Sequence, residues 1–230
     1  MNDQAQQPET ASRPTGPVVV VGLGNPGLEY AWTPHNAGFL AIDRIAEQER
    51  ATVQNRRCKA QTGAARIAGR EVILAKPETF MNLSGLSVAA LGKEFGITPE
   101  ERANRLVVLY DDLDLPLGTF KIRERGSPTG HNGARSISAS LGSHEWLRVK
   151  IGVGPADSRK TGSKEAIEAG AQKAEKRRGG KDYLLDPMSK RDLAVLDEVL
   201  DRVASAVRKI VTDGPAAAMN EFNRKDLGPA

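Results

Sequence analysis

The sequence predicts an α/β fold: one domain with a mixed central β-sheet and helices on both faces of that sheet. Two observations support this. Short apolar, β-branched runs alternate along the chain with longer segments of helical periodicity. The chain has 230 residues, of which 39% are hydrophobic, and this is enough to bury one full core. Alternation of this kind is typical of a sheet that helices cover on both sides.

Strands are expected where apolar or β-branched residues run together between turn residues. The first, Val18–Val21, is continuously apolar, as in a strand that is buried on both faces. The same criterion predicts further strands at Glu71–Ala75, Leu106–Tyr110, Thr119–Arg123 and Trp146–Val153. A weaker strand pattern occurs at Lys59–Ile67.

Helical patterns lie between these strands and after the last one. We expect helices at Asn36–Arg50, Leu83–Phe95, Gly133–Leu141, Ser189–Val211 and Pro215–Phe222. The longest has an apolar stripe formed by Leu193, Leu196, Leu200, Val203, Val207 and Ile210. Ser189 can cap its first turn, and Gly214-Pro215 can end it.

The segments outside this pattern are polar. Residues 1–16 are rich in Gln, Pro, Ser and Thr and fit neither a signal peptide nor a transit peptide, so we expect a disordered tail. Residues 17–225 form the domain, and 226–230 form a second tail. Residues 163–181 form a charged, glycine-punctuated surface insertion that includes Lys176, Arg177 and Arg178, for which a solvated charge run is the simpler interpretation.

The composition excludes some classes of site and modestly favours one class of partner. The single cysteine, Cys58, excludes an intramolecular disulfide and a multi-cysteine metal site, and it fits a reducing compartment. No apolar run is long enough to span a membrane. A net charge of +4 and a pI of about 9.2 modestly favour a polyanionic partner.

The most informative segment is the glycine-rich turn Gly22-Leu23-Gly24-Asn25-Pro26-Gly27, which follows the first strand. Its glycine spacing, with Asp43 further on, fits a dinucleotide-binding motif in which the acid lies about 20 residues later. However, Pro26 has no amide hydrogen where that motif needs one. Asp43 also falls within a helical repeat. The context therefore disfavours dinucleotide binding.

Further polar clusters occur at element boundaries: Pro34–Gly38, Phe80–Gly85, Asp111–Asp114 and Gly130–Gly133. In open α/β sheets, such residues converge at the carboxyl ends of the strands. A histidine beside a carboxylate, among neutral amides, can activate water as a general base, while amide NH₂ groups stabilise a developing oxyanion.

Other chemistries lack their motifs. There is no Gly-x-Ser-x-Gly elbow, no phosphate-binding loop ending in Gly-Lys-Ser/Thr, and no second histidine four residues after His144. The acidic cluster could suggest Mg²⁺. Alternation along an extended segment points Asp111 and Asp112 to opposite sides, however, so we expect no metal site.

Taken together, the motifs GLGNPGLEY, PHNAGF, FMNLSG, YDDLDLPLG, GHNG and AMNEFN resemble those of the bacterial-type peptidyl-tRNA hydrolases. The resemblance is collinear from Val18 to Asn223. It implies an esterase that cleaves the bond between a peptide and the 3′-terminal ribose of tRNA, without metal or cofactor. It also implies a cytoplasmic monomer that binds the acceptor stem and 3′ CCA end of peptidyl-tRNA, with no membrane contact and no obligate protein partner.

The resemblance implies roles for individual residues. His35 matches the general base, Asp111 the acid that stabilises that base, and Asn25 the residue that distinguishes blocked from free aminoacyl-tRNA. Positions that contact the tRNA end and the peptide, or line the same cleft, are Tyr30, Phe80, Met81, Asn82, His131 and Asn132. Positions that hold the 5′-phosphate of the acceptor stem are Arg123 and Lys150, which agrees with a polyanionic substrate.

Simpler interpretations stay open for several of these residues. Phe80 and Met81 could be core residues, Tyr30 could serve packing, and His131 could be a hydrogen-bonding residue at a helix start. For the whole chain, the alternative is a noncatalytic RNA-binding relative of the same fold, similar to some organellar splicing factors.

Overall fold

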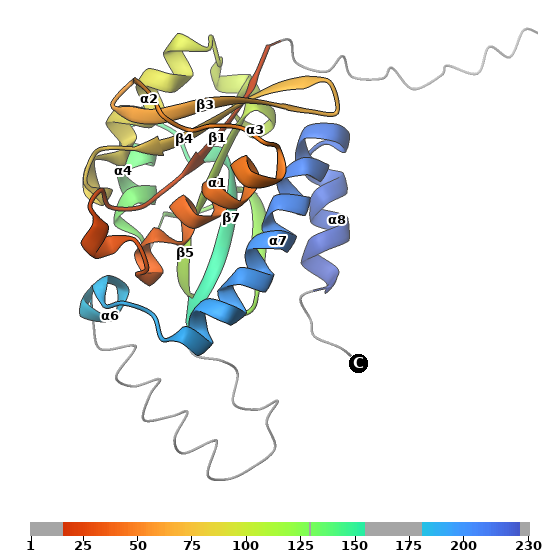
Figure 1. Cartoon of the computed structure of the whole chain (residues 1–230). Coiled ribbons are helices and arrows are strands. Elements are labelled where there is room, and N and C mark those ends of the chain that lie inside the picture. Colours follow the sequence, from red (N-terminus) through yellow and green to blue (C-terminus); the bar gives the residue numbers. More distant parts are fainter. Residues whose placement is uncertain (1–15, 129, 155–180, 226–230) are drawn as a thin grey trace, which may run out of the picture.

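A seven-stranded mixed sheet runs through the computed structural model, which describes residues 16–128, 130–154 and 181–225 (Figure 1). Its strand order is β2-β3-β4-β1-β5-β7-β6, and β4, β1, β5 and β7 run parallel. The remaining pairs, β2 with β3, β3 with β4 and β6 with β7, are antiparallel. The predicted fold class is confirmed. The predicted tails and the basic insertion lie outside the described residues, apart from Gly16 and Lys181.

The six predicted strands are present, with shifted ends: β1 (Val18–Gly22), β3 (Ala60–Ile67), β4 (Arg70–Pro77), β5 (Leu106–Pro116), β6 (Phe120–Arg125) and β7 (Glu145–Gly154). Strand β5 continues past the predicted end at Tyr110, because pairing with β7 extends to Pro116 opposite Gly154. Strand β2 (Asn55–Arg57) was not predicted. It has no apolar residue and is extended because it pairs with β3.

The five predicted helices are also present, as α1 (Ala37–Gln48), α2 (Ser84–Glu94), α4 (Asn132–Leu141), α7 (Lys190–Asp213) and α8 (Pro215–Lys225). The hydroxyl of Ser189 accepts the amide N–H of Asp192 at 3.1 Å and so caps α7 as predicted. Gly214 ends α7 with φ +90°. Two short helices were not predicted, α3 (Arg102–Arg105) and α6 (Lys181–Leu185).

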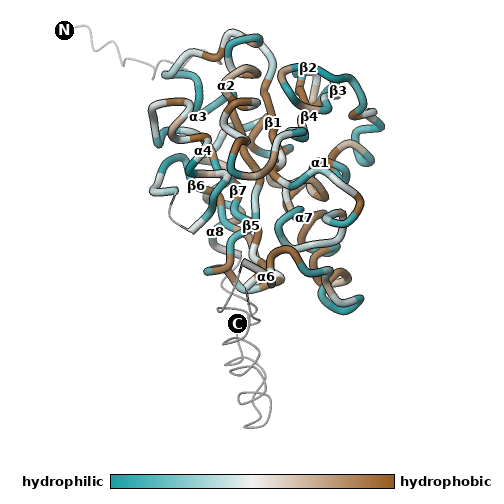
Figure 2. The backbone as a smooth tube through the Cα atoms, turned by 90° about the vertical axis from the view of Figure 1, so that its left-hand side faces the viewer, coloured by the Kyte–Doolittle hydropathy of each residue, from teal (hydrophilic) through white to brown (hydrophobic). Residues whose placement is uncertain are grey.

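The helices cover both faces of the sheet. On one face, α1, α7 and α8 pack over buried residues of alternate strand positions, such as Val20 and Leu109. On the other, α2 and α4 pack over Val19, Val108 and Trp146. Figure 2 shows α2 and α4 on one side of the hydrophobic strands and α1 and α7 on the other. None of the helices in the described part of the chain has the length and apolarity needed to cross a membrane.

The glycine-rich turn after β1 is explained by close packing against α1. A Cβ atom at Gly22 would lie 2.1 Å from the carbonyl oxygen of Gly38, and one at Gly38 would lie 2.4 Å from that of Leu109. These glycines therefore let the start of α1 approach the ends of β1 and β5 directly. This brings the segment just before α1 against the carboxyl ends of the parallel strands. As predicted, Asp43 lies within α1, where it pairs with Lys76.

Candidate active site

Two histidines share one buried carboxylate oxygen of Asp111, which lies on β5 just beyond the carboxyl end of the neighbouring strand β1. Nδ1 of His35 lies 2.9 Å from Oδ1 of Asp111, and Nε2 of His131 lies 2.8 Å from the same atom. All three residues are buried, with 7%, 2% and 6% of His35, Asp111 and His131 exposed. His35 lies on η2 (Pro34–Asn36), and His131 immediately precedes α4. Residues 76 apart in the sequence therefore meet, as the sequence analysis expected.

The electrostatics of this trio keep Asp111 ionised. Burial alone would raise the pKa of the Asp111 carboxyl, but the two adjacent histidines outweigh burial and hold the pKa well below its usual range. Burial lowers the pKa of His35, while the charge and hydrogen bond of Asp111 raise it by more, so the pKa lies above the usual 6.5. An ionised carboxylate accepts, so Nδ1 of His35 donates to it and Nε2 of neutral His35 keeps its lone pair.

Asn25 is held by a separate set of hydrogen bonds, to Met81 and to Asn36, the residue after His35. Its Oδ1 accepts the amide N–H of Met81 at 3.0 Å, which ties the loop after β1 to η3 (Met81–Leu83). The structure shows no hydrogen bond donated by Nδ2 of Asn25 to any of the residues it describes. This amide NH₂ group is therefore available to a ligand.

The other predicted substrate-binding residues differ in how far they are exposed to solvent. Phe80 is 61% exposed, so the core interpretation of Phe80 is wrong, whereas Met81 is only 4% exposed and belongs to the core below α2 and α4. Asn82 is exposed, and Tyr30 is half-buried at the end of η1 (Leu28–Tyr30). The side-chain oxygen of Asn132 accepts from Arg135. His131 caps α4, as the helix-start interpretation predicted.

The two predicted phosphate-binding residues lie on neighbouring antiparallel strands. In the register of β6 and β7, Lys121 is opposite Lys150 and Arg123 is opposite Arg148. Arg123 and Lys150 are therefore on one face of the sheet, the face that α4 covers. Arg123 is exposed, whereas Lys150 forms an ion pair with Asp112, directly after Asp111. A phosphate at Lys150 would compete with that carboxylate.

Two residues that the sequence analysis did not single out support the site. Asn36 accepts the amide N–H of Asn25 at 2.8 Å and donates to its carbonyl at 3.1 Å, so it holds the Asn25 backbone on both sides. The ring of Tyr110 packs 4.8 Å from that of His131. Both residues stand next to predicted site residues in the sequence, but their contacts depend on the tertiary fold.

Within the described residues, His35, Asp111 and His131 form a group whose ligand atoms lie within 4.8 Å of one another, as a metal site requires. Their mutual hydrogen bonds satisfy the same atoms without an ion. In the acidic cluster that could have suggested Mg²⁺, Asp111 contacts the two histidines and Asp112 forms an ion pair with Lys150. That the reaction needs no metal stays a prediction.

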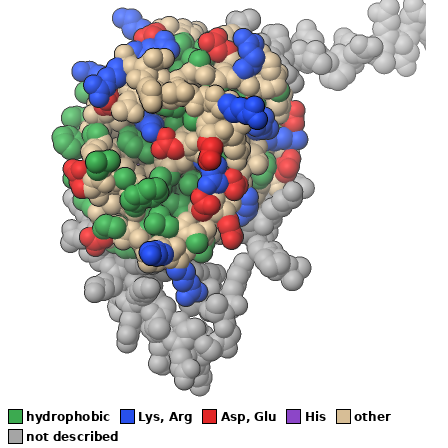
Figure 3. Space-filling model, viewed as in Figure 1, with side chains coloured by type: hydrophobic (Ala, Val, Ile, Leu, Met, Phe, Trp, Pro, Cys, Tyr) green, Lys and Arg blue, Asp and Glu red, His purple; other side chains and the backbone are tan. Residues whose placement is uncertain are grey.

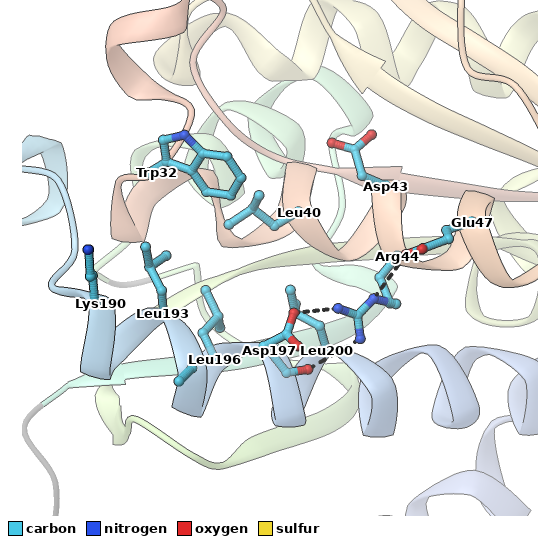
Figure 4. Close-up of a pocket in the computed structure, with 11 residues that line it drawn as sticks. Trp32, Leu40, Asp43, Arg44, Glu47, Lys190, Leu193, Leu196, Asp197 and Leu200 are labelled. Carbon is cyan, nitrogen blue, oxygen red and sulfur yellow. Dashed lines mark hydrogen bonds and ion pairs between the residues drawn. The ribbon is translucent and has the colours of Figure 1, made fainter.

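Two hollows lie along α1, and the first of them reaches Asn25. One of about 420 Å³ is lined by Asn25, Asn36 and residues of η1 and α1. The other, of about 490 Å³, lies between α1 and α7, where Arg44 pairs with Asp197 (Figure 4). Trp32, which is 59% exposed, lines both. Figure 3 shows that hydrophobic side chains gather on this face of the molecule.

Comparison with known proteins identifies the family of the chain. The family model described as peptidyl-tRNA hydrolase matches residues 19–229. The chain is 55% identical to a peptidyl-tRNA hydrolase of Acidobacterium capsulatum, covering 92% of this chain and 98% of the relative, and 47% identical to one of Koribacter versatilis, covering 92% and 94%. The crystal structure of the peptidyl-tRNA hydrolase from Acinetobacter baumannii is similar with a TM-score of 0.72 and 31% identity over 90% of this chain and 94% of that one. The chain therefore belongs to the peptidyl-tRNA hydrolase family.

Proposed function

We propose that this protein hydrolyses the ester bond of peptidyl-tRNA, with His35 as the general base that activates water. The observation that carries the proposal is the buried hydrogen bond from Nδ1 of His35 to Asp111, which leaves Nε2 of the neutral ring free to take a proton. Family membership supplies the substrate class.

The reaction follows from these groups. Nε2 of His35 takes a proton from water as the water oxygen attacks the ester carbonyl carbon. Asp111 stabilises the imidazolium that forms. The carbonyl oxygen becomes an oxyanion, to which Nδ2 of Asn25 can donate. When the bond to the ribose breaks, the imidazolium returns its proton to the leaving 3′ (or 2′) oxygen, which leaves a free peptide and tRNA.

Substrate binding needs groups of a different kind. The acceptor stem is polyanionic, and the cations Arg123 and Lys150 lie on one face of the sheet close to the strand that carries Asp111. We infer that they bind a phosphate of the stem, while Tyr30, Phe80, Asn82 and Asn132 contact the CCA end and the peptide. The exposed ring of Phe80 suits stacking on a base. We further infer that the protein acts as a cytoplasmic monomer and needs no cofactor.

Hydrolysis of N-acetylated aminoacyl-tRNA by the wild type and by His35→Ala tests the proposal. Loss of the base should lower kcat by about 10²- to 10⁴-fold, with tRNA affinity retained in a gel-shift assay. His144→Ala is the matched control, because His144 is exposed and lies outside the trio. Near-normal turnover by His35→Ala would refute the mechanism. Binding of tRNA without turnover by the wild type would instead support the noncatalytic RNA-binding alternative.

A further inference from the structure

His131 uses both of its ring nitrogens within the protein. Nε2 faces Oδ1 of Asp111 at 2.8 Å, and Nδ1 accepts the amide N–H of Ala134 at 3.2 Å. The second contact caps the N-terminus of α4 and satisfies one of the free amide groups of its first turn. One buried imidazole thus joins a helix end to the carboxylate of the active site.

The cap determines which nitrogen of His131 carries the proton. A backbone amide can only donate, so Nδ1 must offer a lone pair. A neutral imidazole with a bare Nδ1 carries its proton on Nε2, and this N–H then donates to Asp111. Protonation of the ring at Nδ1 would break the cap, so with α4 capped the contact of His131 to Asp111 is a hydrogen bond donated by Nε2–H.

The surroundings hold the ring in this orientation. The ring of Tyr110 lies 4.8 Å away and that of His35 5.0 Å away. Burial raises the pKa of the Tyr110 hydroxyl, so this neighbour is neutral. A Cβ at Gly133 would lie 3.1 Å from Cε1 of His131 and 2.6 Å from Sδ of Met81, so glycine at this position leaves room for the ring.

We propose that His131 is a positioning residue for the hydrolytic site rather than a substrate-binding one. The end of α4 sets the tautomer of His131, and the Nε2–H of His131 holds Oδ1 of Asp111. Asp111 in turn keeps the proton of His35 on Nδ1, which leaves Nε2 of His35 bare for water. This inference rests on the proposed function, in which His35 is the base. A hydrogen bond from His131 to substrate would require one of its two internal bonds to break.

Two substitutions test the contacts of Nε2 and Nδ1 of His131 separately. In His131→Gln, the side-chain amide nitrogen replaces Nε2, so the donor to Asp111 remains and the cap is lost. We expect kcat within a few-fold of wild type and a melting temperature about 2–4 °C lower. In His131→Asn, the side-chain oxygen replaces Nδ1 and caps the helix, but the side chain is too short to reach Asp111.

For His131→Asn we therefore expect a near-normal melting temperature with kcat about 10- to 100-fold lower, since a hydrogen bond to a charged group is lost. The KM should change little. The acidic limb of the pH–kcat profile should move to lower pH, because a less firmly held Asp111 raises the pKa of His35 by less. A shift of that limb to higher pH would mean that His131 acts by withdrawing charge from Asp111. A change in KM alone would mean substrate contact. Either result, or equal activity of the two variants, would overturn the proposal.

The tautomers of His35 and His131 can be measured in the absence of substrate. The chain has three histidines, and His144 is exposed, so ¹⁵N-histidine NMR spectra contain two site signals and one reference. In the neutral wild type we expect the proton on Nε2 of His131 and on Nδ1 of His35. In His131→Asn, His35 should become a mixture of tautomers. A proton on Nδ1 of His131 in the wild type would refute the positioning role, whereas correct tautomers in a protein that hydrolyses no substrate would refute only the proposed function.

Discussion

Replacing Asp111 by asparagine removes one charge from the centre of the trio and keeps its shape. In the wild type, Oδ1 of Asp111 accepts from both His35 and His131 at 2.9 and 2.8 Å. An asparagine oxygen can still accept both bonds, but it cannot stabilise the imidazolium that forms when His35 takes a proton from water. The interaction between unit charges about 4 Å apart is about 4 kcal/mol at an effective dielectric constant near 20. Since Asp111 is buried, we expect the substitution to remove half or more of this stabilisation energy from the transition state.

This loss corresponds to a decrease in kcat of about 30- to 10³-fold, at roughly 1.4 kcal/mol for each factor of ten. The pH dependence follows from the direction of the His35 shift. Asp111 raises the pKa of His35, and the base is active only when deprotonated, so activity in the wild type rises as pH increases through this raised pKa. Without the carboxylate the pKa falls, and the acidic limb moves to lower pH.

The assay is the pH dependence of kcat on N-acetylated aminoacyl-tRNA at saturating substrate, for wild type, Asp111→Asn and Asp114→Asn. Asp114 is a matched control because it lies three residues along the same strand and is exposed. It should retain the wild-type rate and profile. An acidic limb of Asp111→Asn that stays in place, or that moves to higher pH, would show that Asp111 does not act through the pKa of His35.

Four further outcomes are expected. The double variant Arg123→Ala/Lys150→Ala should have a higher KM for full-length peptidyl-tRNA and a nearly unchanged kcat. The salt dependence of KM should become shallower, because fewer counterions are released on binding. The KM for a minimal substrate without the acceptor stem should not change. Asn25→Asp keeps the acceptor for Met81 but loses the NH₂ donor, so discrimination between N-acetylated and free aminoacyl-tRNA should weaken, as a competition assay with both substrates would measure. Asn223→Ala should lower the free energy of unfolding by about 1–3 kcal/mol in urea titrations, because two bonds to the Ile122 backbone at 2.9 and 3.1 Å are lost, with kcat retained. Treatment with a chelator followed by dialysis should leave kcat unchanged, and recovery of lost activity by an added metal ion would contradict a metal-free reaction.

The alternation of apolar runs with helical periodicity was sufficient to predict the fold class and every long element. These patterns are local: a strand such as β1 is apolar because both of its faces are buried, and α7 begins at Ser189 because that side chain caps its own first turn. The strand that was missed lacks such a local signal. Strand β2 is extended only because β3 pairs with it.

The sequence also indicated candidate site residues, through motifs that occur in one order along the chain. What each residue does within the site depended on tertiary structure, because its partner lies far away in the sequence. His35 meets Asp111 across 76 residues, and Asn223 binds Ile122 across 101 residues. The two nitrogens of His131 divide between Ala134 and Asp111, and Lys150 pairs with Asp112. Local propensity can predict a strand or a cap, but only the packed sheet decides which side chain receives which proton.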